Sequence, residues 1–238
     1  MQSANEKSHE GNYLKDSWGE VLKCISELER LQLLASGAQS DADVFLQRSS
    51  VSDKNDSDLK NSFHLLRQIE PSLVDRIFTR SATLNSEAIV DFVDHICAVS
   101  RSELENAESP RVFCLQKIVE ITYYNMGRIR FVWSRIWSIL AAHFEQAGVH
   151  PNINISMYAI DSLRQLATKF LEKDELSNYE FQKQFLRPFE RIIENDSPDI
   201  QEFVVQCLSR VVLGSIKNVK SGWRSVFSVR HLNSFLSG

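Results

Sequence analysis

Apolar residues recur at steps of three and four along almost the whole chain, and this is the spacing of a helix that buries one face. The first such stripe, within about Asp16 to Ala35, consists of Trp18, Val21, Leu22, Ile25, Leu28 and Leu31. Only eight glycines are present, none in an Asn-Gly or Asp-Gly hairpin, and no sustained two-residue alternation announces a sheet. The sequence therefore predicts an all-α protein.

Helix-start signals in the second half of the chain recur at a regular spacing. Pro110, Pro151 and Pro198 each precede an apolar helical pattern, at intervals of about 41 and 47 residues, which is the length of a two-helix repeat. Each helix pair leaves an apolar face that it cannot cover alone, so neighbouring pairs must stack. We expect an armadillo/HEAT-like, right-handed helical solenoid of stacked antiparallel helix pairs. Because the units share little sequence, an irregular helical bundle is the alternative.

Composition predicts one domain with polar additions. Residues 1–15 are polar and lack the apolar segment of a signal peptide, which indicates a disordered leader. A single helical-repeat domain is expected over 16–229, with a flexible polar loop inserted at 36–57 and a tail at 230–238. After the loop, helical patterns cover Leu59–Gln68, Ser72–Arg80 and Ser86–Ser100. No apolar run approaches the roughly 20 residues that span a bilayer.

The net charge of -4 conceals an uneven distribution along the chain. Residues 1–110 hold 11 basic and 19 acidic side chains, whereas residues 111–238 hold 16 basic and 12 acidic ones. No acid follows Glu202, but five cations do: Arg210, Lys217, Lys220, Arg224 and Arg230. Uneven charge is informative about partners rather than about the fold, so the C-terminal part is where an anionic partner is expected.

Motifs that carry enzyme chemistry are missing from the sequence. No glycine-rich phosphate loop occurs, and neither G-x-S-x-G nor H-E-x-x-H is found. The four cysteines lie in apolar helical patterns without a C-x-x-C pair, which favours packing in a reducing compartment. His95 and Cys97 resemble part of a metal site, but no second ligand pair follows. We predict a non-enzymatic chain without a cofactor or a metal.

Two basic features are candidates for contacts with a partner or a membrane. At roughly 1 kcal/mol per cation near anionic lipid, they suit an anionic membrane surface or an acidic protein. The alternative is that the cations complement the dipole at a helix C-terminus. Nucleic acid is not expected, because the pI is about 5.9. The candidate residues are Arg128 and Arg130 in the turn at 125–130, and Lys217, Lys220, Trp223 and Arg224 near the C-terminal end.

Four large aromatic residues allow two interpretations: Tyr123, Tyr124, Trp133 and Trp137. Exposed aromatic rings supply much of the energy at many interfaces, so these residues could form a ligand cage or an anchor. Their helical spacing fits a buried core better, and a core role is the prediction.

Several long blocks of the chain resemble the large brefeldin A-inhibited exchange factors for Arf GTPases, in the region immediately after their exchange domain. The resemblance covers nearly everything from Asp16 to Val229. The blocks are WGEVLKCISELERLQLLASG from Trp18, VDRIFTRSATLNSEAIVDFVDHICAVS from Val74, LQKIVEITYYNMGRIRFVWSRIWSIL from Leu115, DSLRQLATKFLEKDELSNYEFQKQFLRPFERII from Asp161 and NVKSGWRSVFSV from Asn218.

This resemblance implies an armadillo-like piece of a much larger protein, located in the cytosol and peripherally on trans-Golgi or endosomal membranes. It implies a regulatory role through GTP-bound Arf and neighbouring domains, in autoinhibition and membrane recruitment. The family's exchange loop, F-R-L-P-G-E, matches nothing in this sequence, so exchange activity is not carried over. Two other functions stay open, a structural helical spacer without a ligand and an unrecognised enzyme.

Overall fold

The computed structural model describes residues 10–35, 70–106, 109–172, 179–220 and 222–236, and these residues contain helices and no strands. The all-α prediction is therefore confirmed for the described part of the chain. In chain order the elements are η1 (Glu10–Tyr13), α2 (Ser17–Ala35), α5 (Pro71–Thr79), η2 (Arg80–Thr83), α6 (Ser86–Leu104), α7 (Phe113–Asn125), α8 (Arg130–Gly148), α9 (Ile153–Leu171), α10 (Tyr179–Ile192), α11 (Pro198–Ser215) and α12 (Trp223–Leu236).

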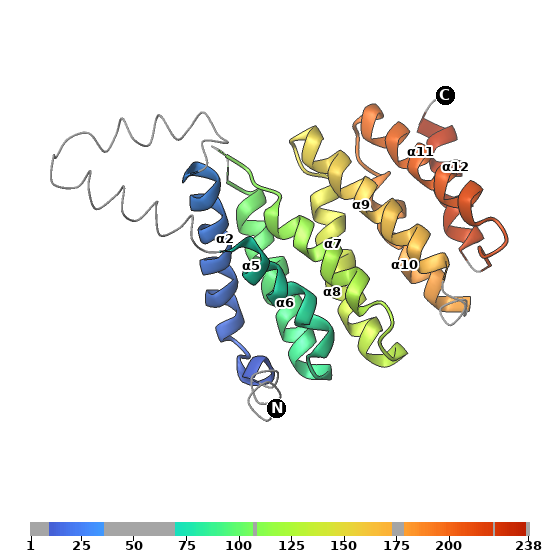
Figure 1. Ribbon diagram of the computed structural model, residues 1–238. Coiled ribbons are helices and arrows are strands. Elements are labelled where there is room, and N and C mark those ends of the chain that lie inside the picture. The colour runs from blue at the N-terminus through green and yellow to red at the C-terminus, as the bar shows by residue number, and fades with distance from the viewer. Residues whose placement is uncertain (1–9, 36–69, 107–108, 173–178, 221, 237–238) are drawn as a thin grey trace, which may run out of the picture.

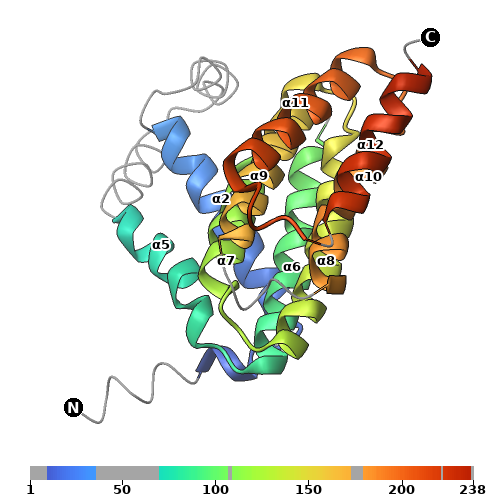
Figure 2. The ribbon, with the colours of Figure 1, turned by 90° about the vertical axis from the view of Figure 1, so that its right-hand side faces the viewer.

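The helices form two rows that run along the molecule (Figure 1). One row contains α5, α7, α9 and α11, and the other contains α6, α8, α10 and α12, so the chain from α5 onward alternates between the rows, while α2 packs on α6. Viewed from the side, the α5–α11 row and the α6–α12 row lie on opposite sides of the array (Figure 2). Neighbours within a row pack on each other and on the facing row, which buries the apolar stripes that the sequence predicts.

Expected boundaries that can be compared agree closely with the helices. The helix expected from Asp16 begins at Ser17, Pro71 and Pro198 stand in the first turns of α5 and α11, and the helix expected from Ser86 extends to Leu104. Of the expected leader, residues 1–9 lie outside the described residues, and 10–13 form η1, which packs on α6. The expected loop at 36–57 and the helix expected at Leu59–Gln68 also lie outside them.

A stack of aromatic rings joins three helices in the core. The Phe185 ring of α10 stacks on Trp137 of α8 at a centroid distance of 4.0 Å and on Phe170 of α9 at 4.1 Å. Trp133, one turn before Trp137, is fully buried as well. The core prediction is thus confirmed for both tryptophans, because α8 is covered by α6, α9 and α10.

Helix α10 continues through Pro188 because a neighbouring helix uses the hydrogen bond that proline cannot make. Proline has no N–H to donate to the carbonyl four residues earlier, which here belongs to Gln184. The indole Nε1–H of Trp137 donates to this Gln184 oxygen at 3.1 Å. Tertiary packing therefore satisfies the carbonyl that would otherwise favour a helix end at this position.

The buried carboxylate of Glu103, at the end of α6, connects three helices. Its Oε1 accepts a hydrogen bond from Ser26 Oγ of α2, and its Oε2 accepts one from the backbone N–H of Cys114 in the first turn of α7, at 2.8 Å. The Arg111 guanidinium lies 3.9 Å from Oε1 and also donates to Ser26 O at 3.0 Å and to Glu29 Oε2 at 2.5 Å. A charged network therefore fixes α2 and the start of α7 on α6.

Candidate functional site

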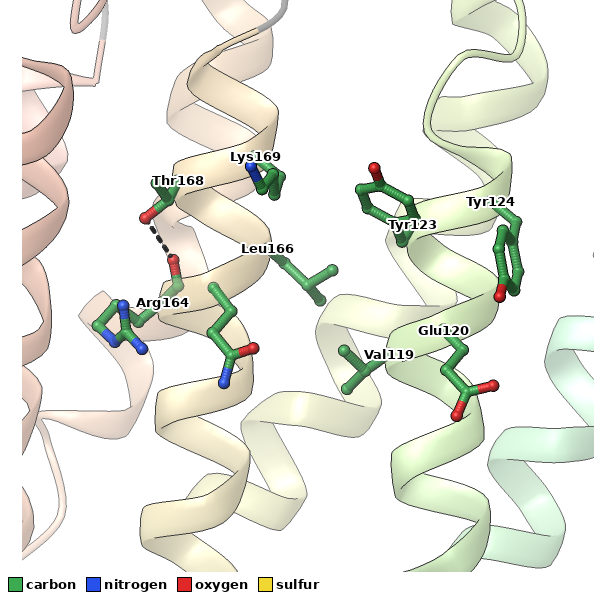
Figure 3. Close-up of a pocket in the computed structure, with 9 residues that line it drawn as sticks. Val119, Glu120, Tyr123, Tyr124, Arg164, Leu166, Thr168 and Lys169 are labelled. Carbon is green, nitrogen blue, oxygen red and sulfur yellow. Dashed lines mark hydrogen bonds between the residues drawn. The ribbon is translucent and has the colours of Figure 1, made fainter.

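A groove of about 460 Å³ lies between α7 and α9, on the face of their row (Figure 3). Leu166 is almost fully buried and Val119 partly buried, and their side chains give the groove an apolar part between the two helices. The other side chains that line it are Glu120, Tyr123, Tyr124, Arg164, Gln165, Thr168 and Lys169. An open groove between two helices is a shape that accepts a protein segment.

Tyr123 and Tyr124 line this groove and are 53% and 41% exposed. The buried face of α7 is formed by Leu115, Ile118, Ile121, Thr122 and Asn125, and the helical period places the two tyrosines outside it. Their rings meet edge to face, with centroids 6.1 Å apart, so each limits the movement of the other. The core prediction is therefore wrong for these two residues, whose rings are available to a partner.

The charged groups around the groove have partners within their own helices. Lys169 Nζ lies 3.0 Å from Glu172 Oε2, and the hydrogen bond with Glu172 raises the pKa of Lys169, with a smaller contribution from the nearby Tyr123 phenol. Arg164 Nε lies 2.6 Å from an Asp161 oxygen. The walls are polar and internally paired while the floor is apolar, an arrangement that favours a protein surface over a strongly charged small molecule.

Arg128 occupies a structural position between α7 and the α5–α6 connection. Its Nη2 donates to the carbonyl oxygens of Ser81, Ala82 and Leu84 at 2.7 to 3.1 Å, and its Nε donates to Asn125 Oδ1 at 2.6 Å. Burial lowers the pKa of this guanidinium from its usual value. These contacts show that Arg128 holds the turn after α7 on the α5–α6 connection. The sequence predicts instead that this side chain contacts a partner.

We expect Arg128→Ala to lower the free energy of unfolding by about 2–3 kcal/mol, because several carbonyls lose a charged donor. Arg128→Lys should recover little of this loss, since an ammonium cannot reproduce the fork of planar donors. Urea denaturation of both variants measures the effect, with exposed Arg80→Ala as the control for the loss of a surface arginine. A loss below about 0.5 kcal/mol for Arg128→Ala would show that these contacts do not stabilise the fold.

The end of the same turn exposes apolar side chains on both sides of a basic one. Ile129 and Phe131 are each 71% exposed and flank the exposed Arg130, the first residue of α8. They follow Tyr123 and Tyr124 of α7 within eight residues, so the end of α7 and the start of α8 together expose four large apolar or aromatic side chains. The sequence signal for the exposure of Ile129 and Phe131 is their position at the connection between two helices, where side chains are less often covered by a neighbouring helix.

The remaining candidates lie at the other end of the array, where α11 meets α12. Lys217 and Lys220 are exposed in the connection between these helices, and Arg224 is exposed in the first turn of α12. Trp223 is partly buried and stacks on Phe227 at 5.6 Å. The structure therefore brings these four residues together at one end and separates them from Arg128 and Arg130.

The described residues offer little reactive chemistry. Cys97, Cys114 and Cys207 are buried, whereas Cys24 is exposed, so the packing expected for all four cysteines is wrong for Cys24. Burial raises the pKa of Cys97 to about 12 and of Cys207 to about 11, so these two thiols stay protonated at neutral pH. Within the described ranges, no group of three or more His, Cys, Asp or Glu side chains is placed to hold a metal ion. Among the helices of those ranges, none is both long and apolar enough to cross a membrane.

Comparison with known proteins connects the chain to exchange factors. The Sec7-like HDS family, described as Mon2/Sec7/BIG1-like, HDS, matches residues 169–235. The human brefeldin A-inhibited guanine nucleotide-exchange protein 1 is 45% identical over 249 aligned residues, which include 94% of this chain and 14% of that protein. Protein 1 of the same name from Arabidopsis thaliana is 41% identical over 264 residues, 92% of this chain and 16% of that protein.

The chain thus spans about one seventh of the length of these curated relatives, and the similarity extends over nearly all of its own residues. This agrees with the resemblance carried by the five sequence blocks. The chain belongs to the family of brefeldin A-inhibited guanine nucleotide-exchange proteins and corresponds to one region of these larger proteins.

Proposed function

We propose that the chain is a non-catalytic regulatory module of a large guanine-nucleotide exchange factor for Arf GTPases. The relatives are named as guanine nucleotide-exchange proteins, and the chain matches one region of them. The exchange loop expected from the family is missing from the sequence. The role of this module is to bind other proteins.

In this proposal the module contacts GTP-bound Arf and neighbouring domains of its parent protein. These contacts restrain exchange in solution and support recruitment to trans-Golgi and endosomal membranes. The two rows of helices belong to a right-handed solenoid, whose long lateral faces suit such contacts.

The observation that carries the proposal is the pair of exposed tyrosines on the α7–α9 groove. Large aromatic side chains that stay exposed beside an apolar floor mark an interaction site, and tyrosine is enriched among the residues that dominate binding energy. Leu166 and Val119 supply the apolar surface, and the paired charges around it need no ionic ligand. The groove is therefore the surface that we assign to activated Arf.

We expect the purified chain to be retained by immobilised Arf loaded with a GTP analogue and not by Arf loaded with GDP. Tyr123→Ser combined with Tyr124→Ser should weaken retention at least about thirty-fold, because truncating an interface anchor costs roughly 2 kcal/mol or more. Tyr13→Ser is the matched control, since Tyr13 is 79% exposed and lies in η1, away from the groove.

Lipid is left out of this experiment so that it reports on protein contacts alone. Equal binding of the double variant and the wild type, with both folded by circular dichroism, would remove the groove from the proposal. Absence of binding to Arf in either nucleotide state would favour a structural spacer.

A further inference from the structure

Helices α11 and α12 lie at one end of the array (Figure 1). An apolar groove lies between these two helices. The groove has a volume of about 270 Å³, and the described residues that line it are uncharged. Val205, Leu208 and Val212 of α11 face Trp223, Val226 and Phe227 of α12 across it. This volume lies just below the roughly 300–1,000 Å³ of sites that enclose a whole small molecule. The groove is therefore suited to part of an apolar group, such as a segment of a lipid acyl chain.

The rim of this groove projects apolar side chains into solvent. Leu213 at the end of α11 is 77% exposed and Phe227 of α12 is 58% exposed, and both line the groove. The stacked Trp223 supports the Phe227 ring from the adjacent turn. These two apolar side chains lie at one rim and so form a local apolar patch rather than isolated exposed residues.

Three cations lie around this rim. Lys217 and Lys220 lie in the connection between the two helices, and Arg224 lies one residue after Trp223. None of these three side chains forms an ion pair with the described residues. The acidic residues of α11, Asp199 and Glu202, belong to its first turns, at the opposite end of the helix.

The connection that carries the cations is held in place from α10. The buried side chain of Gln182 accepts hydrogen bonds through Oε1 from the backbone N–H groups of Lys220 at 2.8 Å and Gly222 at 3.3 Å. Its Nε2 donates to Asn218 O at 2.9 Å. The backbone under Lys220 is therefore positioned by three hydrogen bonds, and the cations are presented from a fixed platform.

We propose that this end of the array docks on the surface of an anionic phospholipid bilayer. Leu213 and Phe227 enter the boundary between headgroups and acyl chains, Trp223 lies at the headgroup level, and Lys217, Lys220 and Arg224 contact lipid phosphates and carboxylates. A bilayer fits better than an acidic protein because the cations surround a projecting apolar rim, and a bilayer offers anionic headgroups and an apolar layer side by side. The inference refines the recruitment part of the proposed function and needs no GTPase.

The test is flotation of the purified chain with vesicles that contain no Arf, made of phosphatidylcholine alone or of phosphatidylcholine with phosphatidylserine. We expect flotation only with phosphatidylserine, and a decrease as salt is raised. Lys217→Gln combined with Lys220→Gln should reduce partitioning about thirty-fold, since each cation contributes a similar increment near anionic lipid. Phe227→Ser should reduce flotation even at low salt, because it removes the inserted ring.

Matched controls test whether the effects are specific to the α11–α12 surface or follow from the loss of any exposed cation or any exposed aromatic ring. Arg76→Gln combined with Arg80→Gln removes two exposed cations at the other end of the array, and Phe131→Ser removes a ring elsewhere that is 71% exposed, more than Phe227. Both controls should float like the wild type. Flotation that is independent of phosphatidylserine, or unchanged in the folded α11–α12 variants, would overturn the inference.

Concentration-dependent self-association that Phe227→Ser abolishes, without any flotation, would assign the rim to a second copy of the chain and would also overturn it. Because the Arf experiment contains no lipid and this one contains no Arf, failure of one leaves the other interpretable.

Discussion

Replacing Glu103 with alanine is expected to lower the free energy of unfolding by about 3–5 kcal/mol, the usual cost of breaking a buried charged network by removing one partner. Three losses contribute. Ser26 Oγ loses its acceptor, the N–H of Cys114 loses the carboxylate that caps the start of α7, and the Arg111 guanidinium loses a nearby negative charge. The N-cap residue of α7, Val112, has no side chain that could take over the cap.

Urea denaturation followed by circular dichroism measures this loss. Glu105→Ala, two residues along and exposed, is the control and should change stability by less than about 0.5 kcal/mol. Glu103→Gln keeps one acceptor oxygen and should fall between the two. If Glu103→Ala loses no more stability than Glu105→Ala, the network does not hold α2 and α7 on α6.

Lowering the pH from about 7.5 to 5 is expected to lower the free energy of unfolding by about 2 kcal/mol through His143 alone. This side chain is buried between α8 and α6, where Nε2 lies 3.0 Å from Ser100 Oγ and Nδ1 has no hydrogen-bond partner among the described residues. Burial, with a smaller contribution from Arg101, lowers the pKa of His143 to about 4, whereas the ordinary value is 6.5.

The sign follows from proton uptake. Between pH 6.5 and 4 the unfolded chain binds a proton at His143 and the folded chain does not, so protonation favours unfolding. The stability is complete above pH 6.5 and is lost as the pH falls towards 4. His143→Gln keeps a polar group that can reach Ser100 and removes the titration, so its stability should change by about 2 kcal/mol less over this interval. Equal losses in the variant and the wild type would contradict the burial of a neutral imidazole.

Local signals in the sequence predict helix existence and many helix ends. The three- and four-residue stripe locates α2 to within one residue, and Pro71 and Pro198 mark the starts of α5 and α11 because proline fits the first turn of a helix. The Ser109-Pro110 signal is less accurate, since α7 begins at Phe113. There the cap comes from Glu103 of another helix, which local sequence does not reveal.

Contacts between helices decide which of the large side chains are buried and which are exposed, and the apolar pattern alone does not determine this. Trp133, Trp137, Tyr123 and Tyr124 all lie in strongly apolar helical segments, but α8 is covered on several sides and α7 leaves its tyrosines at an open groove. Arg128 is a basic residue in a turn, which predicts a surface cation. In the structure its guanidinium binds carbonyls of a connection 44 to 47 residues earlier in the chain. The groove itself consists of residues from two helices, so its existence depends on how α7 and α9 pack.

Hydrogen–deuterium exchange of the chain, alone and with Arf loaded with a GTP analogue or GDP, tests the proposed docking function most directly. The account predicts slower exchange in residues 119–131 and 164–169, which contain the groove and the turn beside it, only with the GTP form. Unchanged exchange in these segments, or equal protection by Arf loaded with GDP, would contradict the assignment of the α7–α9 groove to the activated GTPase.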